Sequence, residues 1–259
     1  MSRSKSVYTG SYELYIFVTA PRADPYVNVL MHVLRQYAIS AVHYVAVVEH
    51  DYTTEQMDER LSDVETNVGR LLNQLANGVY GHSKIATEPG WVTAYQECRN
   101  KLDRTSVRRV PISWNDLDAK LKEFIAGGPV MFDVTTLKKN LLVDVVALLL
   151  SRGFTAIFSF EVITSGLPRF DERGLIHALS PNGYRYRSLA DSKHVQQARS
   201  RTIAHSMTFR TLLVLTSVVG FVVLIIQLFY PNSVLESVIV ALGTTAAISG
   251  LLAGLRRTD

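Results

Sequence analysis

The sequence predicts a three-layer α/β domain with a mostly parallel sheet, followed by a C-terminal two-helix transmembrane hairpin. Two observations carry this prediction. Short β-rich apolar segments alternate with segments of helical periodicity over most of the chain, which is typical of parallel sheets covered by helices on both faces. The apolar excess is concentrated near the end of the chain. We therefore expect a cytoplasmic α/β domain in residues 1–189, a basic juxtamembrane linker in residues 190–210 and the hairpin in residues 211–257.

Composition narrows the function classes. The chain has 259 residues, of which 47% are hydrophobic and 19% charged, so a disordered protein is excluded. The single cysteine, Cys98, excludes an intrachain disulfide and a Cys-rich zinc module, and favours a reducing compartment. The net charge of +4 is too small to indicate nucleic-acid binding, so we expect no direct contact with DNA. The seven histidines lack metal-binding spacing, so we expect no metal site.

The first β-α-β unit begins with an apolar, β-rich run in residues 12–20. Asp24 is a plausible N-cap and Pro25 a plausible first helical residue, so a helix is expected from there to about residue 37. A second apolar run in residues 41–48 completes the unit, and its two strands should lie parallel.

Two further helices have clear boundaries. Thr53 begins a capping box of sequence TTEQ, and the helix after it should end at residues 77–78. Its expected buried face consists of Met57, Leu61, Val64, Val68, Leu71, Leu72 and Leu75. Ser113 is a suitable N-cap for a helix over residues 114–125. Between them, residues 79–110 mix Gly, Pro and Arg with short apolar pieces, and no element is assigned there.

The second β-α-β unit is the clearest in the sequence. Residues 129–136 form an apolar strand, residues 137–152 a strongly apolar helix and residues 154–163 the next strand. The following segment, residues 168–189, mixes turn residues with apolar pairs. We expect it to form an edge hairpin or a loop packed on the sheet.

The membrane hairpin rests on two apolar runs. Residues 211–230 carry no charge over twenty residues, enough to cross a hydrocarbon layer of about 30 Å. After a Pro-Asn-Ser turn, residues 234–255 offer a second span. Arg and Lys flank both outer ends and are absent from the connecting loop, which predicts a multi-pass inner-membrane protein with both termini cytoplasmic.

Small residues recur on one face of the second span, and they allow close helix packing. They are Gly243, Ala247, Gly250 and Gly254. They could pack within the hairpin or between protomers of a homodimer or higher homo-oligomer, and both interpretations stay open.

Two strand ends are candidates for ligand binding, because open parallel sheets bind ligands outside the carboxyl ends of their strands. The first end supplies Thr19, Arg22 and Asp24. The second supplies Asp133, Thr135, Thr136, Lys138 and Lys139. Hydroxyl donors, two cations and the exposed N–H groups of a helix start would suit a phosphate group. The alternative is ordinary helix capping by a threonine, with the lysines as solvated surface.

The segment Asp133-Val-Thr-Thr-Leu-Lys-Lys139 resembles the D-x-T-G-G-T-K element of CARF domains, the Rossmann-like sensors of CRISPR and related defence systems. Thr136 and Leu137 stand in place of the glycine pair. The strand that ends at Thr19 and Arg22 is similar to the first nucleotide-contacting loop of that family. The resemblance implies a Rossmann-like sensor of a cyclic oligonucleotide or another nucleotide, acting as a homodimer. No other cofactor is expected.

Together these features predict a membrane effector of an antiviral defence system, that is, a toxin that disrupts the membrane. A nucleotide second messenger or a defence-system partner protein is expected to trigger its self-association. A membrane-anchored TIR-like or deoxyribosyltransferase-like hydrolase is the first alternative, and it requires a catalytic glutamate, for which Glu49 and Glu161 are the candidates. A non-catalytic, membrane-tethered protein-docking module is the second.

Overall fold

The structure, a computed structural model, describes residues 11–48, 52–80, 83–84, 89–163, 174–180, 182–193 and 195–196. Contacts divide the chain into the units Met1–Val195 and Gln196–Asp259. The predicted hairpin in residues 211–257, with its small-residue face, lies outside the described residues, and so does Glu49. None of the helices in the described ranges has the length and apolar character needed to cross a membrane.

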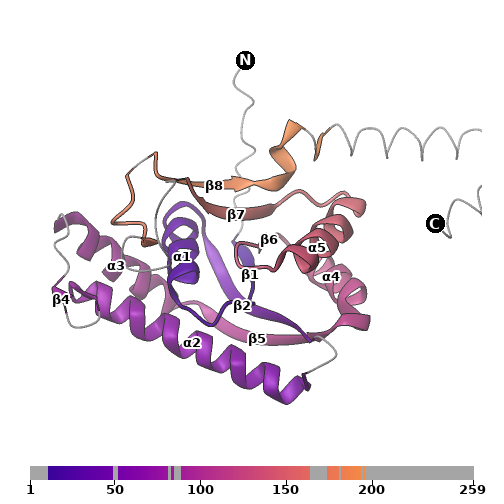
Figure 1. The fold of residues 1–259 in the computed structure, drawn as a ribbon, viewed down its shortest axis with the longest axis horizontal. Helices are drawn as coiled ribbons and strands as arrows, with labels where there is room; N and C mark the ends of the chain where they lie inside the picture. The colour runs from indigo at the N-terminus through magenta and orange to yellow at the C-terminus, as the bar shows by residue number, and fades with distance from the viewer. Residues whose placement is uncertain are drawn as a thin grey trace, which may run out of the picture. The chain divides into compact units, whose positions relative to one another are not determined.

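A six-stranded sheet in the order β5-β2-β1-β6-β7-β8 forms the centre of the first unit (Figure 1). Its strands are β1 (Tyr12–Phe17), β2 (Ile39–Val48), β5 (Ser106–Ser113), β6 (Val130–Asp133), β7 (Ile157–Val162) and β8 (Tyr184–Ser188). All neighbouring pairs are parallel except β7 and β8. A separate ribbon pairs β3 (Val79–Tyr80) with β4 (Ser83–Lys84). The predicted α/β class with a mostly parallel sheet is confirmed.

Helices cover both faces of the sheet. One face of the sheet packs against α1 (Asp24–Gln36), α2 (Thr54–Ala76) and α3 (Pro89–Leu102). The other face packs against α4 (Leu117–Ala126) and α5 (Lys139–Ser151). Figure 1 shows α4 and α5 together, away from α1 and α2. Successive β1 residues alternate between the two cores: Leu14 packs with α1 and α2, whereas Tyr15 packs with α4. Burial on both faces explains why the strands appear in the sequence as unbroken apolar runs.

Local sequence signals set several element boundaries as expected. Thr53 Oγ1 accepts from the Gln56 amide at 3.3 Å, and Gln56 Oε1 accepts from the Thr53 amide at 2.9 Å, so the capping box is confirmed. The helix ends before Gly78, whose φ of 73° lies in the left-handed region that glycine tolerates. The two β-α-β units, β1-α1-β2 and β6-α5-β7, both form with parallel strands.

Other cap predictions were wrong because tertiary partners outcompeted local ones. Asp24 is not the N-cap of α1: Ala23 holds that position, and Asp24 lies in the first turn, where Tyr80 donates to its Oδ1 at 3.3 Å. Lys138, rather than Thr135 or Thr136, precedes α5. After Ser113 the chain first forms a 3₁₀ turn, η1 (Trp114–Asp116), with no side-chain cap from Ser113.

Strand β5 lies in the region left unassigned from the sequence. It pairs with β2 over eight residues, from Ala41 opposite Ser106 to Val48 opposite Ser113. Arg109 of this strand contacts two acidic side chains of α2, Asp58 at 3.5 Å and Glu65 at 3.9 Å. These ion pairs help to attach to α2 a strand that has few apolar residues. Edge strands tolerate such charges and proline.

The chain between β7 and β8 includes a segment, residues 174–180, that packs on the α1 face. Asn28 of α1 holds it, because Nδ2 donates to the Gly174 carbonyl at 2.8 Å and Oδ1 accepts from the Ile176 amide at 2.8 Å. Leu175 and Ile176 are buried in that core. Strand β8 then pairs with β7 at the sheet edge, which is one of the two arrangements expected for residues 168–189.

Candidate functional site

The centre of the sheet contains a topological switch point between β1 and β6. From β1 the chain continues through α1 on one face, and from β6 through α5 on the other. In open parallel sheets, the crevice outside the carboxyl ends of two such strands is where ligands bind. The two loops singled out from the sequence follow these two strands. The structure therefore brings Thr19 and Arg22 to the same edge as residues 133–139.

The two loops are hydrogen bonded to each other through threonines. Thr19 Oγ1 donates to the Thr136 carbonyl, and the Thr19 amide donates to Thr136 Oγ1 at 3.3 Å. Thr136 Oγ1 in turn donates to the Phe17 carbonyl at 2.7 Å. These hydroxyls are occupied within the protein, so their role is to fix the loops. The structure supports neither of them as a helix cap.

Two further residues complete this edge, and no signal in the sequence points to either of them. Tyr26, buried in the first turn of α1, donates to the Ala20 carbonyl at 2.7 Å, and its hydroxyl lies 3.2 Å from Thr136 Oγ1. Burial raises the pKa of Tyr26 to about 12, so the hydroxyl stays protonated. Arg60 reaches across from α2 and donates to the Thr19 carbonyl. A side chain from a distant helix therefore places a cation beside the end of β1.

Asp133 lies beneath the carboxyl edge of the sheet, inside the protein. Its side chain is fully buried; Oδ1 accepts from the Thr135 amide at 3.1 Å and Oδ2 from the Thr135 hydroxyl at 3.0 Å. Thr135 Oγ1 also accepts from the Phe160 amide at 2.8 Å, which joins β6 to β7. Desolvation raises the pKa of Asp133 to about 7, although interactions of the carboxyl with Thr135 and Tyr186 oppose the rise. Asp133 and Thr135 thus fix the conformation of the loop after β6 through buried hydrogen bonds.

Exposed cations make this edge attractive to anions. Arg22, Lys138 and Lys139 all have exposed side chains. The N-termini of α1 and α5, at Asp24 and Lys139, also lie at this edge, where helix dipoles favour negative charge. The positive groups are therefore the part of the predicted site that faces solvent.

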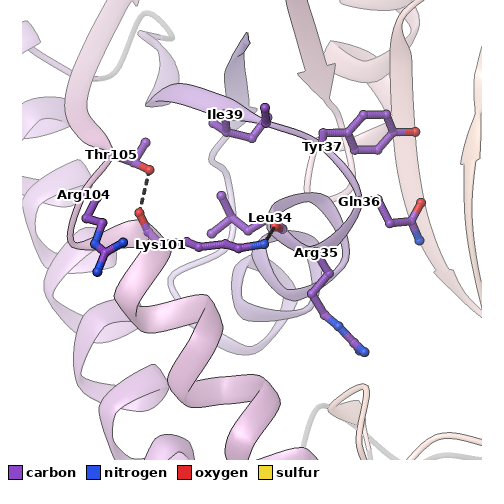
Figure 2. A pocket seen from close by; sticks show the side chains of 9 residues that line it. Leu34, Arg35, Gln36, Tyr37, Ile39, Lys101, Arg104 and Thr105 are labelled. Atoms are coloured by element: carbon purple, nitrogen blue, oxygen red, sulfur yellow. Dashed lines mark hydrogen bonds between the residues drawn. The ribbon is translucent and has the colours of Figure 1, made fainter. Parts of the chain in front are cut away.

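A cavity of about 490 Å³ lies at the opposite end of the strands, where α1 and α3 end and β2 begins (Figure 2). Arg35, Lys101 and Arg104 line it. Lys101 Nζ donates to the Leu34 carbonyl at 2.7 Å and so closes the C-terminus of α1. The Arg35 guanidinium lies 5.8 Å from the centre of the Trp91 ring. These two cations stabilise the helices, and the cavity lies at the end of the strands where ligands do not usually bind.

A second, open cavity of about 600 Å³ lies between the start of α2 and β5. Its charged lining is mostly acidic, from Glu55, Asp58 and Glu59, and Arg109 neutralises part of it through its contact with Asp58. This lining disfavours phosphate.

Of the two candidate glutamates, Glu161 lies within the described residues, where it forms an ion pair. Glu161 is 38% exposed, and its Oε1 accepts from Arg187 at 2.8 Å across β7 and β8, at the sheet edge. Cys98 is buried, and burial raises the pKa of its thiol to about 12, so a reactive thiolate is disfavoured. Within the described ranges, His, Cys, Asp and Glu form no group of three that could hold a metal ion.

Comparison with protein-family models and with curated proteins gave no match. Function is therefore inferred from the carboxyl edge of the sheet and from the sequence.

Proposed function

We propose that the α/β domain is a Rossmann-like, CARF-like sensor that binds a phosphate-bearing ligand, a cyclic oligonucleotide or another nucleotide, outside β1 and β6. One observation carries this proposal. The two loops expected from the sequence to contact phosphate follow the two strands of the switch point, and Thr19 and Thr136 hold them together. A crevice at this place in a parallel sheet is the usual ligand site.

In the proposed site, the cations and backbone amides contact the ligand, and the threonines position them. Arg22, Lys138 and Lys139 approach the phosphates from the solvent side, and Arg60 approaches from α2. A well-formed hydrogen bond between a charged side chain and phosphate contributes about 1.5–3 kcal/mol. Thr19, Thr135 and Thr136 act through the loop geometry, because their hydroxyls already have partners in the protein.

We further propose that the C-terminal apolar runs are the output of the sensor. Residues 211–230 and 234–255 would form an inner-membrane hairpin with both termini cytoplasmic, and ligand binding would trigger self-association and membrane disruption in antiviral defence. The sequence supports this through twenty uncharged residues, their basic flanks and the small residues of the second span.

The ligand proposal is tested by titrating the full-length protein in detergent with a panel of cyclic di-, tri- and tetranucleotides, followed by calorimetry. Arg22→Ala with Lys138→Ala should weaken binding at least about 100-fold, since two charged hydrogen bonds of about 1.5 kcal/mol or more each are lost. The matched control is Arg70→Ala with Lys122→Ala, because these two cations contact Asn67 and Asp118, away from the crevice. Unchanged affinity in the first variant, or equal loss in both, would show that the site is misplaced.

A further inference from the structure

Strand β8 is held to the domain at the sheet edge and is the last strand before the C-terminal unit. It pairs with β7 alone, antiparallel, with Phe160 opposite Tyr186. Arg187 adds an ion pair with Glu161 on β7 at 2.8 Å. Both of these contacts join β8 to β7. A further contact between β8 and β6 would connect β8 to the carboxyl edge, where the ligand is proposed to bind.

Tyr186 provides the geometry for such a link. Its ring stacks on Phe158, with centroids 5.4 Å apart and planes at 5°, and lies 4.6 Å from the ring of His32 on α1. Its hydroxyl is buried and has no hydrogen-bond partner of normal geometry in the part of the chain that the structure describes. A buried hydroxyl without a partner is costly, so a nearby acceptor is expected to engage it.

The Asp133 carboxyl is that acceptor. Asp133 pairs with Phe158 across β6 and β7, and the Tyr186 ring stacks on that same Phe158, so the carboxyl and the hydroxyl are neighbours. Thr135, two residues along the chain, donates to the carboxyl through its amide and its hydroxyl. Thr135 begins the loop that leads to the exposed Lys138. A continuous set of contacts thus runs from this loop through Thr135 and Asp133 to β8.

We infer that Asp133 and Tyr186 form a conformational latch, in which a small shift of the Tyr186 hydroxyl onto the carboxylate clamps β8 to β6, and displacement of the loop at residues 134–138 opens it. The latch is a property of the domain and needs no ligand. Its use as a path from the ligand crevice to the residues after β8 rests on the proposed function.

The chain offers a matched control on the same strand. Tyr184 also faces the α1 side, and its ring stacks on Phe160 with centroids 5.2 Å apart and planes at 11°. It is the first residue of β8, two residues before Tyr186, and it pairs with Val162 on β7. Replacing either tyrosine with phenylalanine keeps the ring and removes the hydroxyl.

The test is amide hydrogen exchange of the full-length protein in detergent at pH 8, without any nucleotide. The latch predicts that Tyr186→Phe speeds exchange in residues 184–188 and, at a distance, in residues 134–138, by about tenfold or more, because a charge-assisted hydrogen bond is lost and β8 then no longer holds the carboxylate that Thr135 bonds. Tyr184→Phe should leave residues 134–138 unchanged.

Slower or unchanged exchange after Tyr186→Phe would overturn the latch, since removing an unpartnered hydroxyl would only relieve its burial. Equal effects of the two variants would overturn it as well. If Tyr186→Phe fails to fold, Asp133→Asn gives the decision by comparison of two strands, because this variant is expected to be more stable overall at pH 8. Exchange in residues 184–188 that becomes faster relative to exchange in β1 supports the latch, and exchange that changes equally in both strands refutes it. No nucleotide takes part, so these results are independent of whether the proposed ligand binds.

Discussion

Replacing Asp133 with asparagine should remove a pH dependence from the stability of the domain. The folded protein holds this carboxyl fully buried, whereas the unfolded chain exposes it to water. Its pKa rises on folding from the usual 3.8 to about 7, mainly through desolvation. A carboxyl with a raised pKa stabilises the fold fully below its unfolded pKa, and this contribution is lost as the pH rises through the folded value.

The size of the effect follows from the two pKa values. Each pKa unit corresponds to about 1.4 kcal/mol, so the rise from 3.8 to about 7 corresponds to at most ~4 kcal/mol of unfolding free energy. Wild-type protein should therefore lose stability steadily between about pH 4 and pH 7. Asparagine does not ionise, and it can still accept from the Thr135 amide. The variant should lack this decline and be more stable than the wild type at pH 8.

Denaturant unfolding of the full-length protein in detergent, followed by the fluorescence of Trp91 and Trp114, gives the measurement. The difference in unfolding free energy between variant and wild type is recorded from pH 5 to pH 8. Asp144→Asn, at an exposed position on α5, is the control and should leave the profile unchanged. A difference that does not vary with pH would refute the reasoning, because it would mean that Asp133 keeps one protonation state in the folded protein.

Three further predictions concern the loops, the segment before β8 and the output. Thr136→Val should reduce stability by about 1–3 kcal/mol and weaken nucleotide binding, because the Thr136 hydroxyl accepts from the Thr19 amide and donates to the Phe17 carbonyl. Thermal unfolding measures the first effect and calorimetry the second. Asn28→Ala should cost about 2–4 kcal/mol and speed proteolysis within residues 174–180, because two backbone bonds are lost. Gly250→Leu should abolish uptake of a membrane-impermeant dye by cells that express the activated protein. In a second experiment the hairpin is exchanged for an unrelated membrane anchor, and toxicity that survives this exchange would reject the pore mechanism.

The sequence predicted those parts of the fold whose signals are local or periodic. The apolar runs of β1, β2, β6 and β7 were recognised because both faces of the sheet are covered, and the capping box at Thr53 involves neighbours in sequence. Strand β5 was missed because its charges are satisfied by α2, a partner that periodicity does not show.

The sequence pointed to the two loops of the candidate site but not to the contacts that their threonines make. The two loops were found from strand ends, and their adjacency follows from the strand order. The threonine hydroxyls were expected to face a ligand or cap a helix, yet Thr19 and Thr136 donate to backbone carbonyls far away in sequence, and Thr135 donates to the nearby Asp133 carboxylate. Tyr26 and Arg60 were missed for the same reason, because their contacts with the loops arise only from packing of α1 and α2.

The central claim is that the crevice outside β1 and β6 binds a nucleotide, and mass spectrometry of the nucleotides carried by the full-length protein tests it most directly. The protein is purified in detergent after incubation with the panel of cyclic nucleotides and separated from free ligand. We predict a nucleotide on the wild type and on Arg70→Ala with Lys122→Ala, and its loss from Arg22→Ala with Lys138→Ala. A wild-type protein that retains no nucleotide, or a crevice variant that retains as much as the wild type, would contradict the account.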